Sequence, residues 1–101
     1  MAYKKLCKTT EVPIGELRVF HILKKDILVA NSKGQFHCLS PLCTHAGAPL
    51  VKGVLNDNEL ECPWHYGSFR ITDGTVIYGE PKEPLQVYSC IVKGDYLFVD
   101  L

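Results

Sequence analysis

Residues 62–69 read CPWHYGSF and set a cysteine and a histidine three positions apart, between a proline, a tryptophan and a glycine. Cysteine thiolates and histidine imidazoles are metal ligands. Residues 40–50, SPLCTHAGAPL, hold a second such pair, with the cysteine and histidine two positions apart. The full pattern is C-x-H, sixteen residues, C-x2-H. It predicts one metal centre with four ligands: Cys43, His45, Cys62 and His65.

The mixed pairs bear on which metal the ligands select. A single zinc ion would accept two cysteines and two histidines, but zinc fingers usually pair like with like, on a hairpin and a helix. Here each segment offers one thiolate and one imidazole, and no helix is evident. This arrangement suits a two-iron cluster, in which one iron takes both cysteines and the other takes both histidines. Zinc in the same ligands, in a structural or interaction module, remains the alternative.

With the ligands in place, the chain resembles a known family. CTHAGAPL, from Cys43, and CPWHYGSF, from Cys62, look like the two cluster-binding boxes of Rieske-type 2Fe-2S proteins. The stretch from Gly79 through Pro84 and Leu85 to Tyr88 is similar to the one that follows the second box in Rieske ferredoxins. The resemblance implies one 2Fe-2S cluster on the four candidate ligands. It also implies a Rieske-like antiparallel β sandwich or barrel that carries a small subdomain of two cluster-binding loops on β-hairpins.

Departures from the quinol-oxidising members indicate which kind of Rieske protein this is. Those members carry an extra cysteine in each box, joined as a disulfide, where this chain has Ala48 and Trp64. They also place a serine and a tyrosine, which donate hydrogen bonds to cluster sulfur, where this chain has Gly67 and Phe69. Without those donors the cluster is expected to lie near the roughly −150 mV end of the Rieske range. Ser68 is one residue out of register.

The resemblance also implies a role. The chain is similar to the ferredoxin component of bacterial multicomponent dioxygenases, which carries one electron at a time from a reductase to an oxygenase. We therefore expect an electron-transfer protein rather than an enzyme, with redox proteins as its partners. The alternative within the family is the small Rieske subunit of a nitrite reductase. That subunit often lacks intact ligands, whereas all four candidates are present here.

The rest of the chain alternates short apolar runs with turn residues, which predicts an all-β fold. Residues 17–24 alternate with period two. No apolar stripe with helical spacing runs for ten or more residues. The expected hairpins pair 27–30 with 35–39, 54–55 with 59–62, 70–71 with 75–78, and 85–92 with 96–101.

Composition sets the remaining bounds. The 101 residues suffice for a single domain, 1–101, with the cluster-binding subdomain at about 41–84. Net charge is zero, which argues against a nucleic-acid partner, and no apolar run is long enough to span a membrane. With five cysteines in irregular spacing and no secretory signal, we expect a cytoplasmic protein.

Charge and the remaining cysteines add two expectations. Residues 41–84 hold six acidic and three basic side chains, so the expected cluster-binding region is negative and the rest of the chain is positive. Such a surface favours a basic patch on a partner. Cys7, Cys38 and Cys90 fall in strand patterns, as does His37, and core packing is the expectation for them.

Overall fold

The computed structural model of the protein describes residues 2–44, 47–64, 67–79 and 83–101. Its elements are short strands and two single-turn 3-10 helices, which confirms the all-β expectation. They are β1 (Tyr3–Lys8), η1 (Thr9–Glu11), β2 (Leu17–Ile22), β3 (Lys25–Ser32), β4 (Gln35–Leu39), η2 (Leu50–Lys52), β5 (Val54–Asn56), β6 (Glu59–Glu61), β7 (Ser68–Arg70), β8 (Val76–Tyr78), β9 (Val87–Tyr88), β10 (Cys90–Lys93) and β11 (Tyr96–Asp100).

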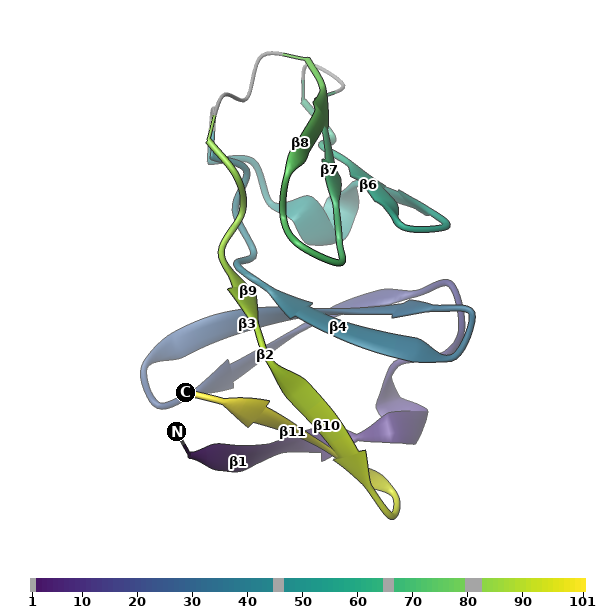
Figure 1. The fold of residues 1–101 in the computed structure, drawn as a ribbon, viewed down its shortest axis with the longest axis vertical. Helices are drawn as coiled ribbons and strands as arrows, with labels where there is room; N and C mark the ends of the chain where they lie inside the picture. Colours follow the sequence, from purple (N-terminus) through teal and green to yellow (C-terminus); the bar gives the residue numbers. More distant parts are fainter. Residues whose placement is uncertain (1, 45–46, 65–66, 80–82) are drawn as a thin grey trace.

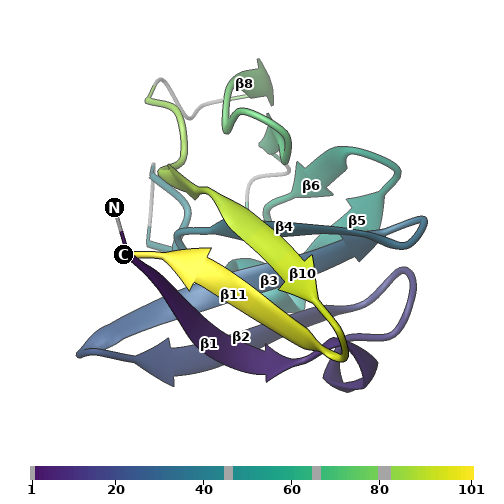
Figure 2. The ribbon, with the colours of Figure 1, turned by 60° about the horizontal axis from the view of Figure 1, so that its bottom comes forward.

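The strands form three antiparallel sheets. Their orders are β1-β11-β10, β2-β3-β4-β9 and β5-β6-β7-β8. The first two sheets make the base of the molecule and contain both termini, and Figure 2 shows them one in front of the other. The third sheet lies at the opposite end from the termini (Figure 1).

The central strand β3 feeds two separate cores. Its residues 27–30 read Ile-Leu-Val-Ala and are all fully buried. Because successive side chains of a strand point to opposite faces, Ile27 and Val29 join the core between the two base sheets. Leu28 and Ala30 join a second core, which also contains residues of the third sheet. A continuous apolar run is therefore a strand covered on both faces.

The expected strand 17–24 and the expected hairpin of 27–30 with 35–39 both end in tighter turns than predicted. The alternation of residues 17–24 predicts a strand to Lys24, but β2 ends at Ile22, and Leu23 and Lys24 make the turn with φ of 49° and 65°. The next turn consists of Lys33 and Gly34, again with positive φ, so residues 31–32 belong to β3. Two-residue turns with both φ positive match the twist of antiparallel strands, which explains the shorter loops.

The expectation of one continuous strand over residues 85–92 is wrong, because the structure has two strands there, β9 and β10. The chain leaves β9, which pairs with β4, and enters β10, which pairs with β11 in the other base sheet. Ser89 lies at the change, and its carbonyl accepts a hydrogen bond from the backbone N–H of Asp100 at 2.9 Å. This segment therefore links the two base sheets. The expected strand 70–71 also differs, because β7 begins at Ser68 and Ile71 lies in the following turn.

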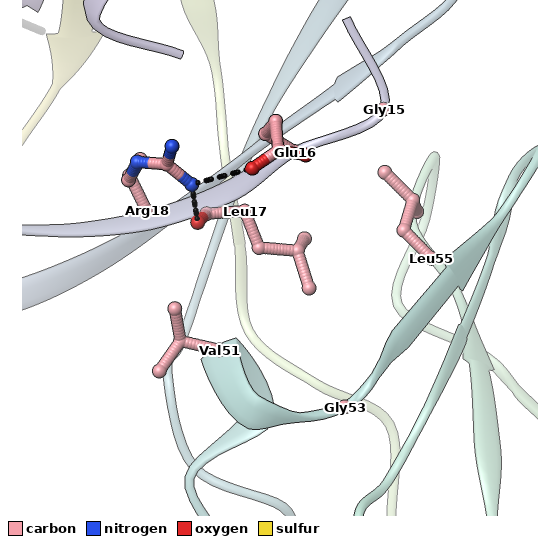
Figure 3. A pocket seen from close by; sticks show the side chains of 7 residues that line it. All are labelled: Gly15, Glu16, Leu17, Arg18, Val51, Gly53 and Leu55. Carbon is pink, nitrogen blue, oxygen red and sulfur yellow. Dashed lines mark hydrogen bonds and ion pairs between the residues drawn. The ribbon is translucent and has the colours of Figure 1, made fainter. Parts of the chain in front are cut away.

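A pocket of about 190 Å³ lies where the base meets the third sheet (Figure 3). Glu16 and Arg18 line it from the base, and Val51 and Leu55 line it from the other side. Arg18 Nη1 pairs with Glu16 Oε1 at 3.1 Å and also donates to the Leu17 carbonyl at 2.8 Å. Of the candidate ligands that the structure describes, neither Cys43 nor Cys62 lines this pocket. In the part of the chain that the structure describes, no helix is long and apolar enough to cross a membrane.

Candidate metal centre

The first candidate loop follows β4 and is closed by backbone hydrogen bonds. The N–H of Leu50 donates to the Pro41 carbonyl, and the N–H of Cys43 donates to the Ala48 carbonyl, both at 2.9 Å. The N–H of Gly47 returns to the Cys43 carbonyl at 2.9 Å, and Gly47 has a φ of 71°, which glycine adopts without strain. Pro, Gly and Ala in this segment thus build a loop that fixes the backbone of Cys43.

The second candidate loop joins β6 to β7. The two strands pair in register from Glu59 with Arg70 to Glu61 with Ser68. The backbone N–H of Cys62 then donates to the Gly67 carbonyl at 2.6 Å. Cys62 is the first residue after β6, so the sheet sets its position directly. A cysteine at the end of a paired strand is held more firmly than one in the middle of a free loop.

The two cysteines come together although they belong to different loops. Cys43 is 3% exposed and Cys62 is 2% exposed, both belong to the same core, and their thiols lie close enough for Cys43 to shift the pKa of Cys62. Burial raises the pKa of the Cys62 thiol and the Cys43 thiol raises it further, while a hydrogen bond from the backbone N–H of Trp64 lowers it. A metal supplies the positive charge that keeps such buried thiols deprotonated.

The other two predicted ligands, His45 and His65, lie outside the described residues, as does Tyr66. What the structure does describe fits the cysteine half of a 2Fe-2S site. Two buried thiols converge, and the Trp64 N–H that donates to one of them is a typical donor to ligand sulfur. That N–H belongs to the backbone, so no residue type in the sequence signals it.

A third segment braces the first loop from the side. Thr44 Oγ1 donates to the Glu83 carbonyl at 2.8 Å, and the N–H of Ser40 donates to the Gln86 carbonyl at 2.9 Å. The N–H of Leu85 in turn donates to the Gly74 carbonyl at 2.8 Å. The segment before β9 is therefore bonded both to the first loop and to the turn between β7 and β8.

Ser68 is the one hydroxyl beside the second loop whose role the sequence leaves open. Its side chain is 1% exposed, and Oγ has no hydrogen-bond partner among the described residues. Phe69, the next residue, is fully buried in the core that contains Cys43 and Cys62. In a regular strand neighbouring side chains point to opposite faces, but the pairing of β7 with β8 shifts register between Ser68 and Phe69.

Comparison with known proteins identifies the family. The Rieske [2Fe-2S] domain matches residues 2–89. The chain belongs to the Rieske family. This confirms the resemblance inferred from the two boxes, and with it the Rieske-type 2Fe-2S cluster as the cofactor.

The Rieske relatives fall into long and short proteins. Human apoptosis-inducing factor 3 is 38% identical over 69 residues, which are 68% of this chain and 11% of that protein. The chain thus spans about a tenth of that relative's length. The biphenyl dioxygenase ferredoxin subunit of Pseudomonas sp. (strain KKS102) is 36% identical over 102 residues, which cover 99% of this chain and 93% of the relative.

Solved Rieske structures agree with the fold. The ferredoxin of Sphingomonas yanoikuyae B1 superposes with a TM-score of 0.92 at 28% identity, and the match covers 99% of each chain. A chain in the complex of reduced oxygenase and oxidized ferredoxin in carbazole 1,9a-dioxygenase superposes with a TM-score of 0.89 at 28% identity, covering 96% of this chain and 91% of the other. The expected Rieske-like fold is confirmed.

The comparisons also bear on role. The relatives matched along nearly their full length are ferredoxin components. The electron-transfer role of these relatives, and the oxygenase that accompanies one of the matched ferredoxins, are the basis of the function proposed below.

Proposed function

We propose that this protein is a low-potential one-electron carrier that takes electrons from a reductase and delivers them to an oxygenase. The observation that carries the proposal is the end-to-end match to a dioxygenase ferredoxin subunit, with 99% of this chain and 93% of that subunit covered. The carbazole dioxygenase complex, in which a ferredoxin accompanies an oxygenase, supports the choice of acceptor. We further propose that the protein works in the cytoplasm, which its five free cysteines favour.

The proposed ligands are Cys43 and Cys62 on one iron and His45 and His65 on the other. The convergence of the two thiols supports the cysteine half. The spacing of the two boxes supports the histidine half. When bound, the cluster accepts and releases one electron. Residues 41–84 are the proposed cluster-binding subdomain, carried on a base formed by the rest of the single domain 1–101.

The low potential rests on what surrounds the cysteines. Ala48 and Trp64 stand where the high-potential members carry the two cysteines of their disulfide, so that bond cannot form here. Ala48 is fully buried, and Trp64 is 49% exposed. Phe69 is buried in the apolar core and has no hydroxyl. The donors that remain near sulfur are backbone N–H groups such as that of Trp64. Fewer hydrogen bonds to sulfur stabilise the reduced cluster less and lower its potential.

Other side chains near the two cysteines are proposed to form a docking surface and to exclude water from the cluster. Leu42 and Trp64, each next to or within two positions of a cysteine, are 51% and 49% exposed. Tyr78, at the end of β8, is 66% exposed. Exposed apolar side chains beside a redox centre exclude water when a partner binds and shorten the path of the electron. Leu50, Leu60 and Phe69 shield the same cysteines from below.

The experiment is a stopped-flow measurement. The protein is reduced with dithionite, freed of excess reductant, and mixed with the oxidised oxygenase component of a biphenyl dioxygenase. Reoxidation that requires the oxygenase and saturates with its concentration supports the proposal. A protein that loads two irons yet passes no electron to the oxygenase, but does pass electrons to a nitrite reductase, favours the nitrite reductase subunit. A colourless protein with one zinc contradicts electron transfer altogether.

A further inference from the structure

A second group of cysteines lies in the base, in a different core from the proposed ligands. Cys7 and Cys38 are buried between the two base sheets, at 6% and 0% exposure, and Cys90 packs against the same core. Cys43 and Cys62 belong to the other core. All five cysteines are described, and the structure arranges no group of three or more Cys, His, Asp or Glu among its described residues to hold a metal.

Two of the base cysteines are neighbours. Cys38 and Cys90 pack in the same core, and each shifts the pKa of the other. The Cys90 thiol donates to the carbonyl of Phe36 on the strand of Cys38 at 3.4 Å. Cys38 pairs with Tyr88 at the end of the β4–β9 ladder, and β10, which begins at Cys90 after the change of sheet, packs against β4. Cys7 also lies close enough to Cys38 to act on it through its charge.

The surroundings give the two thiols different chemistry. The hydrogen bond from Cys38 lowers the pKa of Cys90, whereas the same bond, together with burial, raises the pKa of Cys38. Cys90 is partly exposed, so a small oxidant reaches it, and Cys38 is not. Burial and the charge of Glu11 raise the pKa of Cys7 to about 11, and Cys7 acts on Cys38 through charge and not through a hydrogen bond.

We propose that Cys38 and Cys90 form a reversible disulfide site that hydrogen peroxide oxidises and a small dithiol reduces. The Cys90 thiolate attacks peroxide, the O–O bond breaks, and Cys90 becomes a sulfenic acid as hydroxide takes up a proton and leaves as water. Cys38 then attacks the Cys90 sulfur. The S–O bond breaks, and the hydroxyl leaves with the Cys38 proton as a second water. Two thiols and one peroxide thus give one disulfide and two waters.

The place of this pair in the chain gives the disulfide a consequence. Cys38 lies on β4, the last strand before the first cluster box, and Cys90 lies on β10, just after β9 brings the chain back to the base. A bond between them closes residues 38–90 into a loop that contains all of residues 41–84. Closing a loop of that length restricts the unfolded chain and stabilises the fold. Oxidation would therefore fasten the strands that carry the proposed cluster-binding subdomain.

The test is peroxide treatment of the purified, cluster-loaded protein, followed by alkylation in denaturant and tryptic mapping without reductant. The expected product joins peptides 34–52 and 83–93, with fragment spectra that place the bond at Cys38 rather than Cys43. Dithiothreitol is expected to remove it. The oxidised protein is expected to melt about 5 °C or more above the reduced protein. Absorption by the cluster before and after treatment checks that the ligand cysteines remain bound.

Three variants separate the proposal from general oxidation. Cys7→Ala, the matched control from the same core, is expected to form the disulfide as the wild type does. Cys38→Ala and Cys90→Ala are expected to form none. In Cys38→Ala, Cys90 is expected to stop at the sulfenic acid, which dimedone traps. Absence of the cross-link in the wild type with both peroxide and diamide would overturn the proposal. So would its undiminished formation in Cys38→Ala.

Discussion

Cys43 and Cys62 meet in one buried core across two loops, although nineteen positions separate them in the sequence. Each cysteine is fixed by its own backbone bond, from Cys43 to Ala48 and from Cys62 to Gly67. The pair thus meets because two independently closed loops are carried on one core. On the proposed function, this is where both thiolates reach the same iron.

Loss of either thiol is expected to abolish cluster binding. Cys43→Ser or Cys62→Ser would reduce bound iron from two per chain to nearly none, because a serine hydroxyl is a poor ligand at neutral pH. Iron and acid-labile sulfide are assayed on protein loaded and purified in parallel. Cys7→Ala is the control, since Cys7 lies in the other core, and it is expected to keep two irons. Full occupancy in Cys43→Ser would place the ligands elsewhere.

Trp64 is expected to affect docking more than potential. Trp64→Ala keeps the backbone N–H that donates to Cys62 but removes a half-exposed aromatic side chain. The midpoint potential is expected to shift by less than about 59 mV, the one-electron equivalent of a tenfold change. The rate of electron transfer to the oxygenase is expected to fall by about tenfold, as for loss of an interface aromatic.

A matched control for Trp64→Ala comes from the base. Val92 on β10 is 50% exposed, and Val92→Ala is expected to leave the transfer rate unchanged. Equal slowing by both substitutions would mean that the partner does not select the Trp64 surface. A large change of potential in Trp64→Ala, with the rate unchanged, would assign the side chain to the cluster environment instead.

Substitution of Ser68 tests whether its hydroxyl contributes to the midpoint potential of the cluster. Ser68 lies one position out of register with the serine of the high-potential members, so Ser68→Ala is expected to leave the midpoint within about 59 mV of the wild-type value. Redox titration of the two proteins side by side measures the difference. A fall well beyond that limit would show that the hydroxyl donates to the cluster after all.

Gly74 is expected to be sterically indispensable. Its φ is 79°, and an added Cβ would clash with the Leu85 carbonyl oxygen. The Leu85 N–H donates to the Gly74 carbonyl, which holds the two backbones close together. Gly94 has a φ of 60° with open space around it, so Gly94→Ala isolates the backbone cost, about 1 kcal/mol. Gly74→Ala is expected to cost roughly 3 kcal/mol, since overpacking adds to that cost. Thermal unfolding of the two variants measures the two losses of stability. Equal losses in Gly74→Ala and Gly94→Ala would exclude a steric clash at Gly74.

Alkaline pH is expected to lower the stability of the two base sheets, because the buried Cys7 thiol ionises there. Burial first, and then the charge of Glu11, raise its pKa from 9.0 to about 11. A raised folded-state pKa stabilises the fold fully below pH 9, and this stabilisation is lost as the pH rises towards 11. The stability gap between wild type and Cys7→Ala is therefore expected to narrow by up to about 3 kcal/mol between pH 8 and 11. A stability difference between wild type and Cys7→Ala that stays constant from pH 8 to 11 would contradict a raised pKa of the Cys7 thiol.

Local patterns predict much of this fold because most pairings are between neighbours in sequence. The hairpins around Lys33-Gly34 and Gly94 are marked by turn residues next to alternating strands. The C-x-H and C-x2-H spacings are themselves local patterns, and they mark both loops. The expectation of core packing for Cys7 and Cys38 is likewise confirmed by their burial.

What the sequence does not reveal depends on distant pairing. Strand β1 pairs with β11 from the other end of the chain, and a register shift between Lys5 and Cys7 breaks its alternation, so its period is hidden. The change of sheet at Ser89 is likewise fixed by a bond to Asp100. Nor does any spacing rule bring Cys90 to Cys38, because that contact follows from the packing of β10 on β4.

The most direct test of the central claim is the EPR spectrum of the purified protein after dithionite reduction, with iron and acid-labile sulfide assayed on the same sample. The account predicts two irons and two sulfides per chain and a rhombic signal whose average g lies below the free-electron value, as histidine ligation of the reduced iron requires. It also predicts a midpoint well below zero. A colourless, EPR-silent protein with one bound zinc, prepared under anaerobic conditions, would contradict it.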